Sequence, residues 1–93
     1  MEFLAINRPR PSADSEQLTA VIPAHLRWVD RGLRTGELAR AARWGHGGMC
    51  IIEAPDEAAA ATFLRGDPLV IEGLVDVEIA AIVSGAPHGL PAA

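Results

Sequence analysis

The sequence predicts an α+β fold of the ferredoxin-like type, with element order β-α-β-β-α-β, for this 93-residue chain. Two observations lead to it. First, four segments look like strands, because each is a short apolar run or alternates with a period of two residues. Second, two segments have the start and stop signals of helices, one after the first strand and one before the last. The order predicts a four-stranded antiparallel sheet with both helices on one face. It assigns residues 1–83 to a single domain.

The first strand is expected from Glu2 to Asn7, because apolar residues occupy both of its faces. Arg8-Pro9-Arg10-Pro11 follows and should end the strand, since proline cannot donate to a sheet ladder. Two interpretations of Arg8 and Arg10 remain open at this point. They are either solvated in a loop or in contact with an anion.

The first helix should begin at Asp14 or Ser15, which are good N-caps, and should end at Gly36. Pro23 falls inside it. Because proline removes a backbone hydrogen bond and clashes with the preceding turn, it predicts a kink or a restart, with a carbonyl freed near Thr19.

Apolar residues at helical spacing in this segment predict its buried face. His25 and Trp28 border that stripe on one side, and an imidazole beside an indole is how a small pocket can begin. The alternative is a core-edge histidine held by a backbone carbonyl. Gly32 is expected to mark a close approach of another backbone. The stripe consists of Ile22, Leu26, Val29 and Leu33.

The second strand is expected from Glu37 to Trp44, with Leu38, Arg40, Ala42 and Trp44 on one face. Arg40, Arg43 and Trp44 make it the strand best suited to bind a ligand. The alternative is an edge strand whose charges discourage aggregation.

Gly45-His46-Gly47-Gly48 should turn the chain into a third strand, Met49 to Ala54, completing a hairpin. Cys50 in that strand is expected to be buried and inert. A second helix should run from Asp56-Glu57 to Arg65. A connector from Asp67 to Gly73, with one helical turn, should follow.

The last strand is expected from Leu74 to Val83, followed by a tail from Ser84 to Ala93 that could reach a neighbouring subunit. The sheet face away from the helices would then be half apolar, and an apolar face of that size should not stay open to water. A second copy of the chain, packed sheet to sheet, would cover it. The residues expected there are Phe3, Ala5, Met49 and Ile51, beside Asp76 and Glu78.

Composition excludes several classes of partner. The net charge of −4 argues against nucleic acid or an anionic membrane as a partner. No apolar run approaches the ~20 residues that a membrane helix needs, and the N-terminus lacks the pattern of a signal peptide. One cysteine permits no intrachain disulfide, which makes the cytoplasm the expected location. The histidines and the cysteine show no metal-ligand spacing, so no metal is expected.

Four short motifs carry a resemblance to a known family: Pro23-Ala24-His25-Leu26, Gly36 before the second strand, Asp67-Pro68-Leu69, and Gly73-Leu74-Val75. With them, residues 1–83 resemble the YciI-like and muconolactone isomerase-like group of the dimeric α+β barrel superfamily. The usual Ala-Gly-Pro after the second strand is replaced by Arg43-Trp44-Gly45, so a different pocket rim is expected.

The resemblance implies a cofactor-free protein, a homodimer or larger homo-oligomer, whose site lies in a cleft between the helices and the sheet. It implies that His25 is the family's histidine, which YciI-like enzymes pair with an aspartate. Asp30 is a poor partner, because five residues along a helix is about 140 degrees round the axis. Asp67 is the better candidate, although it could instead simply cap the following turn.

The sequence therefore predicts a small cofactor-independent isomerase or lyase that acts on a small-molecule substrate. It would move a proton next to a carbonyl in a lactone, quinone or polyketide-like ring, with His25 as general acid and base and Asp67 as its acid partner. Arg40 or Arg43 would hold a carboxylate or enolate, and Trp28 and Trp44 would form apolar walls. A non-catalytic dimer that binds a small ligand or supports a pathway enzyme is one alternative, and a cofactor-free monooxygenase is another.

Overall fold

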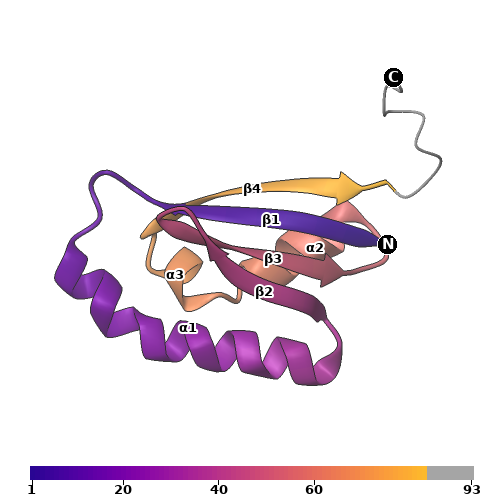
Figure 1. Cartoon of the computed structure of the whole chain (residues 1–93), viewed down its shortest axis with the longest axis horizontal. Coiled ribbons are helices and arrows are strands. Elements are labelled where there is room, and N and C mark those ends of the chain that lie inside the picture. The colour runs from indigo at the N-terminus through magenta and orange to yellow at the C-terminus, as the bar shows by residue number, and fades with distance from the viewer. Residues whose placement is uncertain (84–93) are drawn as a thin grey trace.

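The computed structural model describes residues 1–83, and the expected tail from Ser84 to Ala93 lies outside the described residues. The chain forms one four-stranded sheet, and Figure 1 shows a long helix running along it. The strands are antiparallel and lie in the order β2-β3-β1-β4, which confirms the predicted ferredoxin-like fold. The elements are β1 (Glu2–Pro9), α1 (Ser15–Thr35), β2 (Leu38–Trp44), β3 (Gly47–Glu53), α2 (Glu57–Leu64), α3 (Pro68–Ile71) and β4 (Val75–Ile82).

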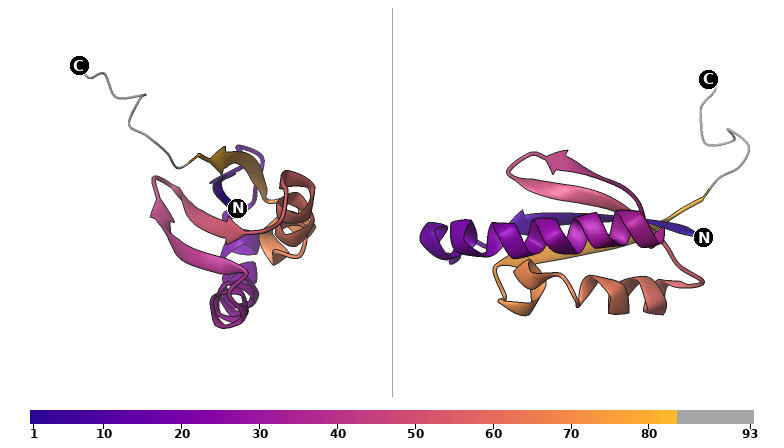
Figure 2. Two further views of the ribbon diagram at one scale, coloured as in Figure 1. Left: turned by 90° about the vertical axis from the view of Figure 1, so that its right-hand side faces the viewer. Right: turned by 90° about the horizontal axis from the view of Figure 1, so that it is seen from below.

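The three helices lie against the same face of the twisted sheet, as both views in Figure 2 show. α1 packs against β2 and α3, whereas α2 and α3 pack against β4. The core between these layers is centred on Phe3, Leu38 and Ile52, which are the largest fully buried side chains. Within residues 1–83, no helix combines the length and the apolar content that crossing a membrane requires.

The first strand is longer than expected, because β1 extends through Arg8 and Pro9. Beyond Asn7 the strand pairs with β4 alone. Pro9 therefore lies at an edge of the sheet, where a strand tolerates a residue without an N–H. Arg8 forms an ion pair with Glu78, and Arg10 Nε lies 2.9 Å from Asp76 Oδ1. The anions that these arginines contact are therefore carboxylates of the protein itself, on β4.

The caps of α1 are as expected. Asp14 accepts a hydrogen bond from the Gln17 N–H, and Gly36 ends the helix in the left-handed conformation at φ +83°. The helix is continuous through Pro23, so it does not restart there. The chain then enters β2 directly, which fixes the long helix beneath that edge of the sheet.

The buried face of α1 was predicted incorrectly. Ile22, Leu26 and Leu33 are 38%, 57% and 45% exposed, and Trp28 and Gly32 are buried instead. The reason is a second set of residues at the same helical spacing, which lies nearer the sheet and places His25 on the buried line rather than beside it. That set is Leu18, Val21, His25, Trp28 and Gly32.

Gly32 decides between the two sets. A Cβ on this glycine would lie 2.8 Å from two side-chain atoms of Leu38 and 3.1 Å from Phe63, so only a residue without a side chain lets the helix lie this close. The close approach is thus to side chains, not to another backbone as expected. Trp28 packs one turn away, with its ring 4.8 Å from that of Phe63.

The sheet faces were only partly predicted. Phe3 and Ala5 are 1% and 3% exposed on the helix side, not on the open face. Both faces of β1 carry apolar residues, so the sequence pattern could not show which face is covered by the helices. Met49 and Ile51 do belong to the open face, where they pair across the sheet with Ile6 and Leu4 of β1.

A second correction concerns β2. The pairing shifts between Leu38 and Arg40, which marks a β-bulge at that point. As a result Leu38 points into the core, and does not share a face with Arg40, Ala42 and Trp44 as expected.

Candidate functional site

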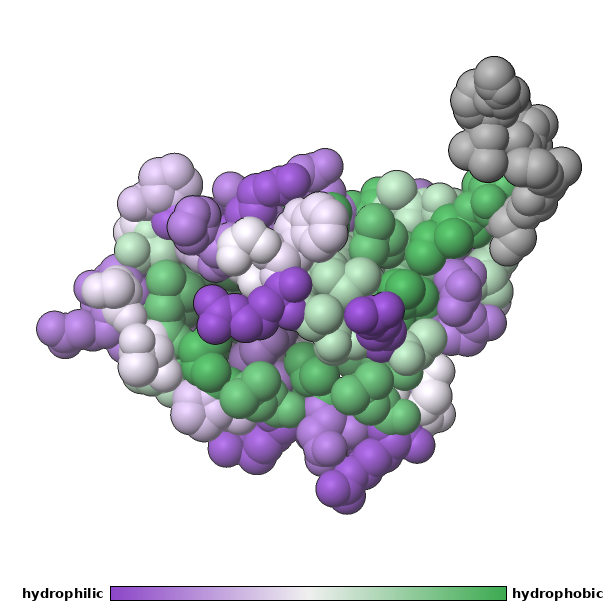
Figure 3. All heavy atoms as spheres, in the orientation of Figure 1, coloured by the Kyte–Doolittle hydropathy of each residue, from purple (hydrophilic) through white to green (hydrophobic). Residues whose placement is uncertain are grey.

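A cavity of about 640 Å³ lies between α1 and the helix-facing side of the sheet. Its volume is in the range of small-molecule sites. α1 contributes Ile22, His25 and Leu26 to the lining, and the segment between α2 and β4 contributes Asp67. Figure 3 shows hydrophobic residues gathered in a band along α1. Ile22 and Leu26 of this helix are exposed hydrophobic residues.

His25 and Asp67 meet in this cavity. His25 Nδ1 lies 2.8 Å from Asp67 Oδ1, and the two side chains are 17% and 3% exposed. The local sequence explains why the carboxylate is there. Asp67 is the N-cap of α3, followed by Pro68 at the start of the helix, and its Oδ1 also accepts the Leu69 N–H at 3.0 Å. Asp67 is therefore both a cap and the neighbour of His25.

This arrangement defines the tautomer of the histidine. Oδ1 of the Asp67 carboxylate is an acceptor for the Leu69 N–H, so the Nδ1–H of a neutral His25 donates to the same oxygen. Nε2 then carries the lone pair. Nε2 has no hydrogen-bond partner among residues 1–83, and no buried side-chain nitrogen or oxygen there lacks one, so Nε2 is open to solvent. A neutral imidazole of this kind can accept a proton from a ligand.

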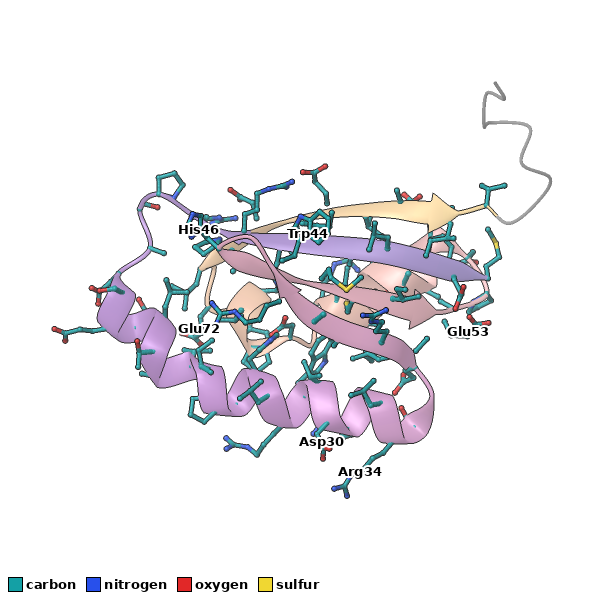
Figure 4. The ribbon with its side chains drawn as sticks, viewed as in Figure 1. Asp30, Arg34, Trp44, His46, Glu53 and Glu72 are labelled. Carbon is teal, nitrogen blue, oxygen red and sulfur yellow. The ribbon has the colours of Figure 1, made fainter. Side chains whose placement is uncertain are left out.

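The other predicted site residues divide between the two sides of the sheet. Trp28 stacks beside His25 with ring centroids 6.1 Å apart, and Arg43 also lines the cavity. Arg40 and Trp44 do not line it, because the bulge in β2 turns them to the open face. Figure 4 shows Trp44 and His46 at the end of the sheet where β2 and β3 join. It also shows Asp30 on the outer side of α1, where it pairs with Arg34 rather than with His25.

A hydrogen-bonded pair of cavity residues was missed by the sequence analysis. Asn7 lies in β1 and Gly48 opposite it in β3, and both line the cavity. The available signal was an asparagine inside a strand, since asparagine is depleted in strands and needs a reason to be there. Asn7 Oδ1 accepts the Gly48 N–H at 2.9 Å.

Cys50 also lines the cavity but is buried, as expected. Burial raises the pKa of its thiol to about 11, and the charge of Asp67 adds to the effect. The thiol is therefore protonated near neutral pH and is a poor nucleophile. Across residues 1–83, no three His, Cys, Asp or Glu side chains gather where they could hold a metal ion.

Comparison with known proteins adds a family and a fold. A family model described as the YCII-related domain matches residues 1–83. No curated protein matches the chain. The fold is similar to that of muconolactone isomerase, with a TM-score of 0.72 and 17% identity over 100% of this chain and 94% of that one.

A second solved structure is similar to the same extent. It is 5-chloro-2-hydroxyhydroquinone dehydrochlorinase (TftG) from Burkholderia phenoliruptrix AC1100, in complex with 2,5-dihydroxybenzoquinone. The TM-score is 0.71 and the identity 22%, over 91% of this chain and 96% of that one. Both likenesses confirm the α+β barrel type of fold that the resemblance predicted.

Proposed function

The chain belongs to the YCII-related domain family, and on that premise we propose that it is a small cofactor-independent isomerase or lyase acting on a carbonyl-bearing ring. The observation that carries the proposal is the 2.8 Å contact of His25 Nδ1 with Asp67 Oδ1 inside a cavity of ligand size. The two similar structures, an isomerase and a dehydrochlorinase, support a lactone or quinone ring as the substrate class.

The proposed reaction begins at His25 Nε2, which takes a proton from the carbon next to the carbonyl. The electron pair of the broken C–H bond moves into an enolate, and Asp67 stabilises the imidazolium that forms at His25. In an isomerisation the proton returns to a different carbon. In an elimination a leaving group departs with its own electron pair. Neither outcome needs an external oxidant or reductant.

The cavity wall supplies the remaining roles. Trp28 would lie along the ring as an apolar surface, because its indole is buried beside His25. Arg43 would stabilise the enolate oxygen or a carboxylate of the substrate through a charge-assisted hydrogen bond. In this proposal Arg40 and Trp44 have no contact with the substrate of their own subunit.

Exchange with heavy water tests this without knowledge of the natural substrate. The protein is incubated in D₂O with a series of unsaturated lactones and substituted hydroquinones. NMR follows deuterium at the carbon next to the lactone carbonyl, or at the carbon next to the phenolic carbon that becomes a carbonyl in the keto tautomer of the hydroquinone. Wild-type protein is expected to catalyse exchange for at least one ring. In the His25→Gln variant the rate should fall by about 10²- to 10⁴-fold, the usual contribution of a general base.

The melting curve of the same variant is the control. His25→Gln should lose only about 1.5–3 kcal/mol of unfolding free energy, as for one hydrogen bond to a charged group. A folded variant that retains full exchange would refute the assignment of His25 as the base. A variant that melts far earlier, yet exchanges normally when folded, would make His25 a core residue.

A non-catalytic ligand-binding protein is the second candidate, and one observation favours it. Leu26 is 57% exposed and lines the cavity, so the cavity of a single chain is open to water, whereas catalytic sites usually exclude it. Ring compounds that bind tightly without any deuterium exchange would support this candidate over the enzyme.

A further inference from the structure

Arg43, Gly48 and Asn7 lie in one row across the sheet, on its helix-facing side. Arg43 of β2 pairs with Gly48 of β3, and Gly48 pairs in turn with Asn7 of β1. All three line the cavity. Because Gly48 has no side chain, an arginine and an asparagine flank a bare stretch of backbone, with their strands two sheet spacings, about 10 Å, apart.

The amide of Asn7 is held in one orientation. Its Oδ1 accepts the Gly48 N–H, so its Nδ2 is left as a donor. Within residues 1–83, Nδ2 has no acceptor, and no side-chain nitrogen there is both buried and unpaired. Nδ2 is therefore an accessible donor at the cavity wall.

Gly48 keeps the space next to that donor empty. A Cβ on Gly48 would lie 3.5 Å from Asn7 Nδ2, in ordinary contact distance, and would clash with nothing. The neighbouring Gly47 differs, because its Cβ would lie 1.9 Å from the Asn7 carbonyl oxygen. Gly47 is thus required by the backbone, whereas the missing side chain of Gly48 leaves room for a ligand atom.

The charge at this end of the cavity is positive and uncompensated. Arg43 forms no ion pair with any described carboxylate. Asp67 is the one acidic residue among the described residues that line the cavity, and its Oδ1 is already shared by His25 and Leu69. A guanidinium and an amide N–H₂ group that border the same cavity, on either side of the side-chain-free Gly48, favour an anionic oxygen as ligand.

We propose that Arg43 and Asn7 form an anion-binding end of the cavity over Gly48, so that the substrate is a small ring carrying an anionic oxygen remote from His25. The inference rests on the proposed function only in taking this cavity as the substrate site. The anionic oxygen can be a carboxylate, a phenolate or an enolate, since all three present the same acceptor to the two donors.

Arg43 and Asn7 lie on the sheet and His25 lies on α1, so the anion-binding end and the proposed base are on opposite walls of the cavity.

Calorimetry with a matched pair of probes tests the proposal. 2,5-Dihydroxybenzoate carries a ring carboxylate, and methyl 2,5-dihydroxybenzoate has the same ring with the charge removed. The wild-type protein should bind the acid at least about 10-fold more tightly than the ester. Arg43→Gln and Asn7→Asp should each lower the affinity for the acid by about 10- to 100-fold and leave the affinity for the ester nearly unchanged.

The variants are chosen to keep the fold. Asn7→Asp retains an acceptor for the Gly48 N–H, and it replaces the Nδ2 donor by a negative oxygen. Gly48→Ala should also lower the affinity for the acid, because the new methyl group occupies the space beside Asn7 Nδ2. Arg31→Gln is the charge-matched control, since Arg31 is exposed on α1 and does not line the cavity.

Three results would overturn the proposal: no binding of the acid to wild-type protein, equal affinity for acid and ester, or the same loss in Arg31→Gln as in Arg43→Gln. The outcome is separate from that of the deuterium-exchange experiment. Acid binding that depends on Arg43 while His25→Gln retains full exchange would uphold this inference and refute the proposed base.

Discussion

Leu38 and Arg40 are two residues apart on one strand, yet they lie on opposite faces of the sheet. Leu38 pairs with Ile52 and Arg40 with Ile51, so the chain advances two residues against one on the partner strand. Without this bulge, Arg40 would share the helix-facing side with Leu38, and Arg43 would lie on the open face. The bulge therefore decides which of the two arginines can meet a ligand.

The first prediction compares those arginines. Arg40→Gln should change the deuterium-exchange rate by no more than about twofold, as is usual for a substitution away from a site, because its side chain is on the open face. Arg43→Gln should lower the exchange rate on acidic rings at least about 10-fold. NMR rates for both variants, measured on the same ring compound, check this. Equal effects would mean that Arg40 reaches the cavity, for example that of a neighbouring subunit.

The second prediction separates the two roles of Asp67. Asp67→Asn keeps a good N-cap for α3, so its melting curve should shift little, but it removes the charge that stabilises an imidazolium at His25. Asp67→Ala loses the cap as well and should cost a further 0.5–2 kcal/mol or so. Urea titrations and exchange rates of both variants provide the measurement. If Asp67→Asn exchanges at the wild-type rate, Asp67 is a cap and nothing more.

The third prediction concerns neighbouring glycines. Gly47→Ala must push β3 away from the Asn7 carbonyl, and overpacking of this kind costs about 1–3 kcal/mol or more. Gly48→Ala places its methyl group at ordinary contact distances and should leave the unfolding free energy nearly unchanged. Thermal melts of the two variants compare them directly. A greater loss for Gly48→Ala would contradict the packing described for this hairpin.

The fourth prediction is a dependence on alkaline pH. The pKa of Cys50 is about 11 in the fold and 9.0 for an ordinary thiol, so the folded state holds the proton more tightly. Below pH 9 both states are protonated and the thiol has no pH effect. Between pH 9 and pH 11 the unfolded chain releases its proton first, so stability falls, by about 2 kcal/mol near pH 10.5.

Urea titrations of wild-type protein and Cys50→Ala, each near pH 8 and near pH 10.5, isolate this effect. The loss of stability on raising the pH should be about 2 kcal/mol larger in the wild-type protein. Identical losses in the two proteins would show that the thiol titrates alike in the folded and unfolded chains.

The fifth prediction is that the chain is at least a dimer. Leu4, Ile6, Met49 and Ile51 form an apolar patch on the open face, and a second sheet would cover it. Sedimentation at micromolar concentration should show no folded monomer. Leu4→Glu, at the centre of the patch, should dissociate the assembly, whereas Arg31→Gln on the outside of α1 should not. A stable wild-type monomer would refute this.

The sequence was sufficient for the helix caps, although not for the end of β1, which continues through Pro9. The caps at Asp14 and Gly36 are predicted correctly, because capping is a property of one or two residues. Asp67 was identified as a candidate from a resemblance, and its proximity to His25 is a geometric finding that the sequence did not contain. Three-dimensional packing decided the rest.

Two of the errors share one cause, which is that two phases of a periodic pattern were equally apolar. In α1 the Ile22 set and the Trp28 set have the same spacing, and only the contact of Gly32 with Leu38 selects the second. In β1, Phe3 and Leu4 are equivalent until the helices cover one of them. The bulge in β2 left no signal in a single sequence, and Asn7 became meaningful only once Gly48 was known to lie opposite it.

The place of β1 in the middle of the sheet has a consequence for how the chain is made. β1 leaves the ribosome before the other described strands, and its two neighbours are β3 and β4, the last of which spans Val75–Ile82. Until that strand emerges, the hydrogen-bonding edge of β1 that faces β4 has no native partner. A nascent or truncated chain that stops before Val75 therefore presents an apolar strand edge, which is the feature that recruits other strands into aggregates.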